Sequence, residues 1–181
     1  MNIMTLDEVV MRRQSIRKYD GSAVTREEIE QMVACAQLAP SWKNSQTSRF
    51  HVVLTADKLL EARQKGMLGR NFEKTEGVGA LIAQTFVGNV AGHDLHGNPD
   101  NELGNGWGCY DAGASGMLLQ LKATELGFDT LVIGIRDAEA LRTVLGIPDE
   151  EIVTAAIAVG KRKEDANRPP RKPLDEIVRF Y

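Results

Sequence analysis

The sequence has 181 residues and a net charge of −3 at neutral pH. Hydrophobic residues make up 43% of it and charged residues 26%, a balance that excludes disordered, collagen-like and disulfide-scaffold proteins. The mild acidity also argues against a general nucleic-acid binder, because phosphate backbones require a basic face.

At this length a single domain over residues 1–181 is expected. The two cysteines, Cys35 and Cys109, belong to no CxxC or Cys/His metal pattern, which is typical of a reducing compartment. The sequence shows no signal-peptide pattern and no run of about 18 apolar residues. We therefore expect a cytoplasmic protein that does not enter a membrane.

Two helices are expected near the start of the chain, over residues 5–12 and 25–39. Each starts with a threonine that is followed three residues later by a glutamate, which is the capping-box pattern. The second has apolar residues at helical spacing on one face, and Pro40 ends it. Residues 13–19, between the helices, are expected to be extended.

Four strands and three more helices are expected in the rest of the chain. The strands are expected over residues 50–54, 79–87, 131–135 and 152–160. The helices are expected over residues 57–66, 111–126 and 137–145. Residues 88–108 are rich in glycine and asparagine, and a loop of that length is uncommon unless it is functional or mobile. The irregular interleaving predicts an α+β, or mixed α/β, fold around one sheet.

The C-terminal segment is basic and proline-rich over residues 161–173, and residues 174–181 form a short terminal element that could be a strand. This tail is too polar to end inside its own core, so residues 161–181 are expected to form an arm that packs on a partner subunit. The Arg168-Pro169-Pro170-Arg171 run allows two interpretations. It is either a polyproline-type peptide ligand or a rigid arm that carries a cation to a phosphate.

A basic segment, Arg13-Gln14-Ser15-Ile16-Arg17, follows the first expected helix. In an extended chain Arg13, Ser15 and Arg17 share one side. Two guanidinium groups and a hydroxyl suit a phosphate dianion, which arginine binds with two parallel hydrogen bonds. The alternative is that the cations only complement the C-terminus of a helix, and the segment alone does not decide between them.

Two further segments have side chains or a backbone suited to ligand binding. Residues 40–46 form a polar stretch directly after a helix, and its amides can bind the polar edge of a heterocycle, although an ordinary loop would also use such residues. Gly134 ends an expected strand, where a glycine lets a backbone N–H approach a ligand or simply makes a bend. His93 and His96 lie in the glycine-rich segment, and no metal site is expected there.

Taken together and in this order, these segments resemble the nitroreductase family of FMN-dependent oxidoreductases. The resemblance rests on an R-x-S-x-R segment, on A-P-S-x-x-N-x-Q at residues 39–46, and on a D-x-G helix that leads into L-G-x-x-T at residues 126–130. Ile133-Gly134, residues 145–148 and R-x-P-L-x-E at residues 171–176 complete it. Each motif is weak, but six in the right order along nearly the whole chain are specific.

The resemblance implies an enzyme that takes hydride from NAD(P)H and reduces a conjugated small-molecule acceptor, such as a nitroaromatic or a quinone, by a ping-pong mechanism. The alternatives are an FMN enzyme of the same fold with another reaction (dehalogenation, enone reduction or oxidation of a small metabolite) and a flavin-binding protein without turnover. The resemblance implies an α+β fold, a three-layer α/β/α sandwich around one mixed, mainly antiparallel sheet. It also implies an intertwined homodimer with both active sites at the interface.

The resemblance assigns cofactor-binding roles, and no side-chain acid or nucleophile. The phosphate and the ribityl chain would be held by Arg13, Ser15 and Arg17, with the Gln14 backbone beside them, and Arg171 would join the phosphate from the C-terminal arm. The other subunit would contribute Pro40, Ser41, Asn44 and Gln46 beside the ring or the ribityl chain. Ile133 and Gly134 would line the ring, with a backbone N–H near flavin N5.

Three features depart from the commonest pattern of the family. Thr47-Ser48 stands where Pro-Trp is frequent, Trp42 is bulky where smaller residues are frequent, and residues 88–108 carry Trp107. All three concern the region near the flavin face, so they bear on the electron acceptor more than on the cofactor.

Overall fold

The computed structural model describes residues 4–181. Its centre is a four-stranded sheet in the order β1-β2-β4-β3. The strands are β1 (Ser48–Val53), β2 (Ala80–Val87), β3 (Asp129–Ile133) and β4 (Glu151–Gly160). All three neighbouring pairs are antiparallel. A parallel contact occurs as an isolated bridge between Ser15 and Thr130, beside β3.

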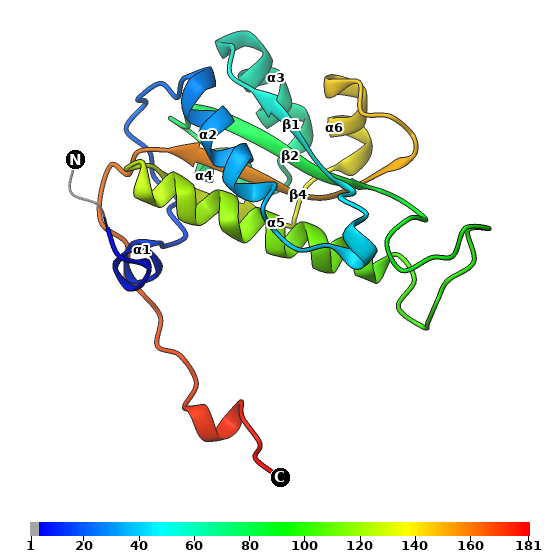
Figure 1. Ribbon diagram of the computed structural model, residues 1–181. Helices are drawn as coiled ribbons and strands as arrows, with labels where there is room; N and C mark the ends of the chain where they lie inside the picture. Colours follow the sequence, from blue (N-terminus) through cyan, green and yellow to red (C-terminus); the bar gives the residue numbers. More distant parts are fainter. Residues whose placement is uncertain (1–3) are drawn as a thin grey trace.

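Helices cover both faces of the sheet and make three layers (Figure 1). On one face lie α2 (Arg26–Ala36) and α5 (Gly106–Glu125), and on the other lie α3 (Ala56–Gly66) and α6 (Ala138–Leu145). Neighbouring residues of β2 alternate between the two cores, because side chains of a strand point to opposite faces in turn. Leu81 packs with the α3 and α6 layer, while Ile82 packs with the α2 and α5 layer. The predicted α+β sandwich is therefore confirmed.

The remaining short elements are α1 (Leu6–Arg12), α4 (Asn71–Lys74) and two 3-10 turns, η1 (Trp42–Asn44) and η2 (Leu174–Glu176). The capping boxes expected at the starts of α1 and α2 are both present. No helix among residues 4–181 has the length and apolar character needed to cross a membrane.

Several expected elements differ from the structure. Helix α2 ends at Ala36 rather than at residue 39. Helix α5 starts at Gly106 rather than at 111, because the bare backbone of Gly108 lets the helix pack directly on the Phe86 ring of β2. Strand β3 covers Asp129–Ile133 instead of 131–135, so Ile135 lies outside the sheet. The tail has a 3-10 turn at Leu174–Glu176, where a strand was one interpretation.

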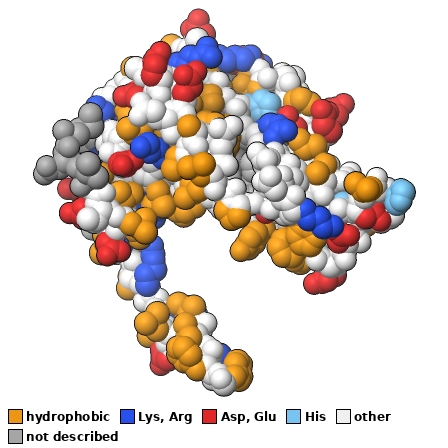
Figure 2. Space-filling model, viewed as in Figure 1, with side chains coloured by type: hydrophobic (Ala, Val, Ile, Leu, Met, Phe, Trp, Pro, Cys, Tyr) orange, Lys and Arg blue, Asp and Glu red, His pale blue; other side chains and the backbone are white. Residues whose placement is uncertain are grey.

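The C-terminal tail leaves the body of the protein beside α1 and ends away from it (Figure 1). Its backbone hydrogen bonds within 173–178 are local, for example from Val178 N to Leu174 O. Its apolar side chains form an exposed cluster on the tail (Figure 2), namely Leu174, Ile177, Phe180 and Tyr181. In the single chain these side chains have no apolar surface to pack against.

Candidate functional site

A small cavity of about 220 Å³ lies where the segment after α1 meets the start of the C-terminal arm. Four arginines line it, two from each segment: Arg13, Arg17, Arg168 and Arg171. The remaining lining residues are Gln14, Ser15, Asn167 and Pro169. The structure thus brings together every residue that was assigned to the phosphate and adds Arg168 and Asn167, which were not assigned.

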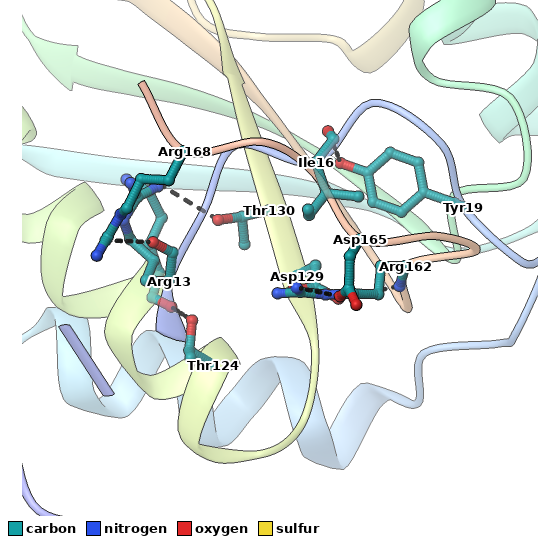
Figure 3. A network of polar contacts seen from close by, with 10 residues as sticks. Arg13, Ile16, Tyr19, Thr124, Asp129, Thr130, Arg162, Asp165 and Arg168 are labelled. Carbon is teal, nitrogen blue, oxygen red and sulfur yellow. Dashed lines mark hydrogen bonds and ion pairs between the residues drawn. The ribbon is translucent and has the colours of Figure 1, made fainter. Parts of the chain in front are cut away.

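The N-terminal wall of this cavity is held by the sheet. Ile16 N donates to the carbonyl oxygen of Thr130 at 3.1 Å, and the Ile16 side chain is 1% exposed. Burial and the charge of Asp129 raise the pKa of Tyr19, so its hydroxyl stays protonated and donates to the Ile16 carbonyl oxygen at 2.9 Å (Figure 3). With Ile16 fixed in the core, the alternation of an extended chain turns Ser15 and Arg17 to the opposite side.

The C-terminal wall is fixed at its base by an ion pair. Arg162 Nη2 lies 2.6 Å from Asp129 Oδ1 at the start of β3, and its Nη1 lies 3.1 Å from Asp165 Oδ1 (Figure 3). Further along, Arg168 Nη2 donates to the carbonyl oxygens of Val10 and Arg13, at 2.9 and 3.0 Å. The arm is therefore attached to the end of α1 by the same side chain that borders the cavity.

The cavity is strongly cationic. Burial lowers the pKa of Arg13, and the charges of Arg168 and Arg171 lower it further. Within residues 4–181 none of the four arginines forms an ion pair with a carboxylate. The Gln14 Oε1 atom is buried there without a hydrogen-bond partner. Such a group of unpaired guanidinium groups fits a bound dianion.

A second cavity, of about 470 Å³, lies between the end of α2, the loop of residues 40–46, β1 and α5. Pro40, Ser41 and Gln46, which the resemblance assigned to the flavin ring or the ribityl chain, line it. Asn44 does not line it and is exposed. Helix α5 contributes Asp111, which was not predicted as a site residue. Asp111 is the one charged residue among residues 106–121 of this helix, which was the signal that could have indicated it.

The loop of residues 40–46 has an unusual backbone. Lys43, Asn44 and Gln46 have φ angles of 48°, 57° and 50°, in the left-handed region that side chains disfavour. Gln46 N donates to Ser41 Oγ at 2.9 Å, which closes the loop on itself. Trp42 N donates to Asp111 Oδ2 at 2.9 Å, which ties the loop to α5.

Residues 88–105 contact this loop through an ion pair, and the start of α5 contacts it through an aromatic ring. Lys43 Nζ lies 2.8 Å from Asp100 Oδ2. The Trp42 and Trp107 rings are 4.5 Å apart between centroids, and the Trp107 and Tyr110 rings 5.7 Å. The features in which the sequence departs from the common pattern, Trp42 and the glycine-rich segment, are therefore in contact with each other.

Ile133 and Gly134 lie apart from both cavities. The Ile133 side chain is 3% exposed and belongs to the core beneath α3 and α6, so only its backbone is available to a ligand. Gly134 follows β3 directly and is exposed. Within one chain the arginine cavity and the loop cavity share no lining residue, and Ile133 and Gly134 line neither of them.

The family model and the related proteins that match this chain agree with one another. The model of the family described as "Nitroreductase family" matches residues 10–161. A Bacillus subtilis protein named as a candidate NAD(P)H nitroreductase, MhqN, is 27% identical over 195 residues, which cover 93% of this chain and 95% of that protein. A Staphylococcus epidermidis NADPH-dependent oxidoreductase is 21% identical and matches 92% of this chain and 68% of its own length.

Solved structures share the whole fold. A nitroreductase family protein from Streptococcus pneumoniae superposes with a TM-score of 0.85 at 22% identity, covering 98% of this chain and 100% of its own. A structure from Exiguobacterium sibiricum, described as a complex with FMN, superposes with a TM-score of 0.79 at 24% identity, covering 100% of this chain and 99% of its own. At these identities the structures establish the fold alone.

Proposed function

The chain belongs to the nitroreductase family of FMN-dependent NAD(P)H oxidoreductases, and we propose that it passes hydride from NAD(P)H to a conjugated acceptor, such as a nitroaromatic or a quinone, by a ping-pong mechanism. The observation that carries this proposal is the arginine cavity, which gathers Arg13, Arg17, Arg168 and Arg171 without a carboxylate among them. A mildly acidic protein needs a specific reason to concentrate cations in this way, and a phosphate dianion supplies one.

The residues of this cavity fit the phosphate end of FMN. Arg13, Arg17 and Arg171 would donate charge-assisted hydrogen bonds to phosphate oxygens, and Ser15 would add a hydroxyl. The unpartnered Gln14 Oε1 can accept a hydrogen bond from a ribityl hydroxyl. Arg168 would act mainly through its charge, since its Nη2 already donates to the two backbone carbonyls.

The rest of the proposed site positions the ring. Bound FMN supplies the hydride chemistry, so the protein needs no nucleophile or acid of its own. The second cavity offers the polar side chains of Ser41 and Gln46 to a heterocycle edge, and the exposed backbone at Gly134 offers an N–H. These groups would orient the flavin ring.

We further propose that the site is completed by a second copy of the chain. The three groups of site residues lie apart within one chain, while the ring and the phosphate of one flavin must be held together. The exposed apolar side chains of residues 174–181 suit an arm that packs on a partner. A homodimer in which each arm covers the other subunit would bury them, and each subunit would then consist of a single domain over residues 1–181.

Colour and melting temperature test the cofactor assignment. Protein purified under native conditions should be yellow, and added FMN should raise its Tm, because a ligand that binds only the folded state stabilises it. Riboflavin, which lacks the phosphate, should raise the Tm far less. Colourless protein whose Tm does not respond to FMN would contradict the assignment.

Anaerobic titration tests turnover. NADH or NADPH should bleach the bound flavin, and a quinone should then restore its colour. Parallel lines in a double-reciprocal plot of steady-state rates would support the ping-pong order. Flavin that binds but does not bleach would instead indicate a carrier without turnover.

A further inference from the structure

We propose that Asp111 is a positioning residue, which holds the loop of residues 40–46 in the conformation that the ligand requires. The inference deepens the proposed function and rests on it for the identity of the ligand. Asp111 lies on α5, is 4% exposed, and borders the second cavity. Its Oδ2 atom accepts the hydrogen bond from Trp42 N at 2.9 Å.

Asp111 has no cation to offset its burial. Among residues 4–181 no basic side chain forms an ion pair with it, and the hydrogen bond from Trp42 N is its one protein partner. A buried carboxylate without a partner is costly, and one that accepts a backbone N–H forms a charge-assisted bond stronger than a neutral one. The cost of burying the Asp111 carboxylate is therefore offset by the same hydrogen bond that attaches the loop.

The loop requires such an attachment. Three of the four non-glycine residues with positive φ in the described chain lie in it: Lys43, Asn44 and Gln46. A non-glycine residue keeps a left-handed backbone conformation only where contacts with the surrounding structure hold it there. Other interactions of the loop with its neighbours are the Lys43–Asp100 ion pair, the contact between the Trp42 and Trp107 rings, and a hydrogen bond from the exposed Arg49 side chain to the Gln46 carbonyl oxygen. The Lys43 side chain is exposed, so its ion pair contributes little. Among residues 4–181, the bond to Asp111 is the hydrogen bond that joins the loop to a buried side chain. The Ser41–Gln46 bond closes the loop but does not connect it to the body.

Asp111 therefore connects the strained loop to the core of the protein. Because α5 also holds the end of α2, through the bond from Ser115 Oγ to Ala36 O at 3.1 Å, one helix sets both walls of the cavity. Without Asp111 the loop is expected to leave the left-handed conformation, and Ser41 and Gln46 would lose their fixed places on the cavity wall.

Three variants test this role. Asp111→Ala removes the acceptor, whereas Asp111→Asn keeps an acceptor oxygen in nearly the same shape but removes the charge. Thr124→Ala is the matched control. Thr124 is a buried polar residue of the same helix, and its Oγ1 bonds within the helix to Gln120 O at 3.0 Å. It touches neither cavity.

The first measurement is hydrogen exchange of the peptide that contains residues 41–46, in flavin-free protein. Asp111→Ala should speed exchange of the Trp42 and Gln46 amides at least tenfold. The second measurement is FMN affinity, which should fall by roughly 10- to 100-fold in Asp111→Ala, the range for a lost hydrogen bond to a charged group. Asp111→Asn keeps a neutral acceptor, which forms a weaker bond, so its effect should lie between the parent and Asp111→Ala in both measurements, and Thr124→Ala should match the parent.

Unchanged loop exchange in Asp111→Ala would overturn the proposal. It would also fail if Asp111→Asn were damaged as severely as Asp111→Ala, because an acceptor oxygen at this position would then not contribute to holding the loop. If the parent protein does not bind FMN, the proposed function fails, while the exchange comparison still decides the role of Asp111.

Discussion

Arg168 Nη2 donates a hydrogen bond to the carbonyl oxygen of Arg13 at 3.0 Å, across 155 positions of the chain. This contact brings the two ends of the sequence together around one cavity. A guanidinium group is suited to this position, since its planar array of donors can bind two carbonyl oxygens and still place its charge beside a neighbouring anion.

Replacing Arg17 or Arg171 by alanine should weaken FMN binding by about 1.5–3 kcal/mol each, the range for a hydrogen bond to a charged group. Riboflavin affinity should not change in either variant, because riboflavin has no phosphate. Arg70→Ala, at an exposed arginine outside the cavity, is the control. Equal FMN affinity in parent, Arg17→Ala and Arg171→Ala, measured by flavin fluorescence quenching, would remove the phosphate assignment.

Arg168→Lys separates the attachment of the arm from its charge. Lysine keeps a cation at the cavity but has no planar fork with which to bind the carbonyls of Val10 and Arg13. We expect residues 163–171 to become more sensitive to limited proteolysis, with a smaller loss of FMN affinity than in Arg168→Ala. Proteolysis at the parent rate in both variants would show that these hydrogen bonds do not hold the arm.

Gly108→Ala should destabilise the fold by about 1–3 kcal/mol, the usual effect of an overpacked core. An added Cβ would meet the Phe86 ring at 2.2 Å, and Phe86 is 1% exposed with no room to move. Gly106→Ala is the matched control in the same helix, where a Cβ would make an ordinary contact at 3.5 Å. Urea unfolding of both variants measures the difference, and equal stabilities would contradict the close packing.

The buried Glu151 carboxylate is expected to make the stability of the fold depend on pH in the acid range. Its carboxylate accepts a hydrogen bond from Thr85 Oγ1 and lies 2.7 Å from His51 Nε2. Burial alone would raise the pKa of Glu151, but these hydrogen bonds and the charges of His51 and Arg49 lower it below its ordinary value. The stabilisation is therefore complete above the unfolded pKa, about 4.3, and is lost as the pH falls through the lower folded pKa.

Glu151→Gln should consequently be less stable than the parent at pH 7 and should lose less stability on acidification below about pH 5. Glu139→Gln is the control, since the Glu139 side chain is 82% exposed and 3.7 Å from Arg142. Unfolding free energies from urea titrations at a series of pH values give the slopes. A parent-like slope in Glu151→Gln would show that another group is responsible.

The tail should decide the oligomeric state. Replacing Ile177 and Phe180 by aspartate should weaken the proposed dimer, because charges would replace apolar side chains that a partner is expected to cover. Leu95→Asp, at a fully exposed apolar residue outside the tail, is the control. Sedimentation velocity over a range of concentrations measures the shift, and a parent chain that is monomeric with FMN bound would contradict the shared site.

Several helix ends can be predicted from neighbouring residues in the sequence. The two capping boxes mark the starts of α1 and α2, and a left-handed Gly146 ends α6, all within a few residues of sequence. Such signals are readable because they act between neighbouring residues. The start of α5 was missed for the opposite reason, since Gly108 is suited to a helix only through its contact with Phe86 in a distant strand.

The sequence by itself therefore determined the class of fold, the family, and the residue types that suit a phosphate and a heterocycle. Only the tertiary structure placed Arg168 beside Arg13, attached the loop to Asp111, and put the Ile133 side chain in the core. Helix caps and apolar periodicity depend on residues only a few positions apart, so they can be recognised in the sequence. Cavities are lined by side chains that are far apart in the chain. Which of these side chains meet is determined by the packing of the layers.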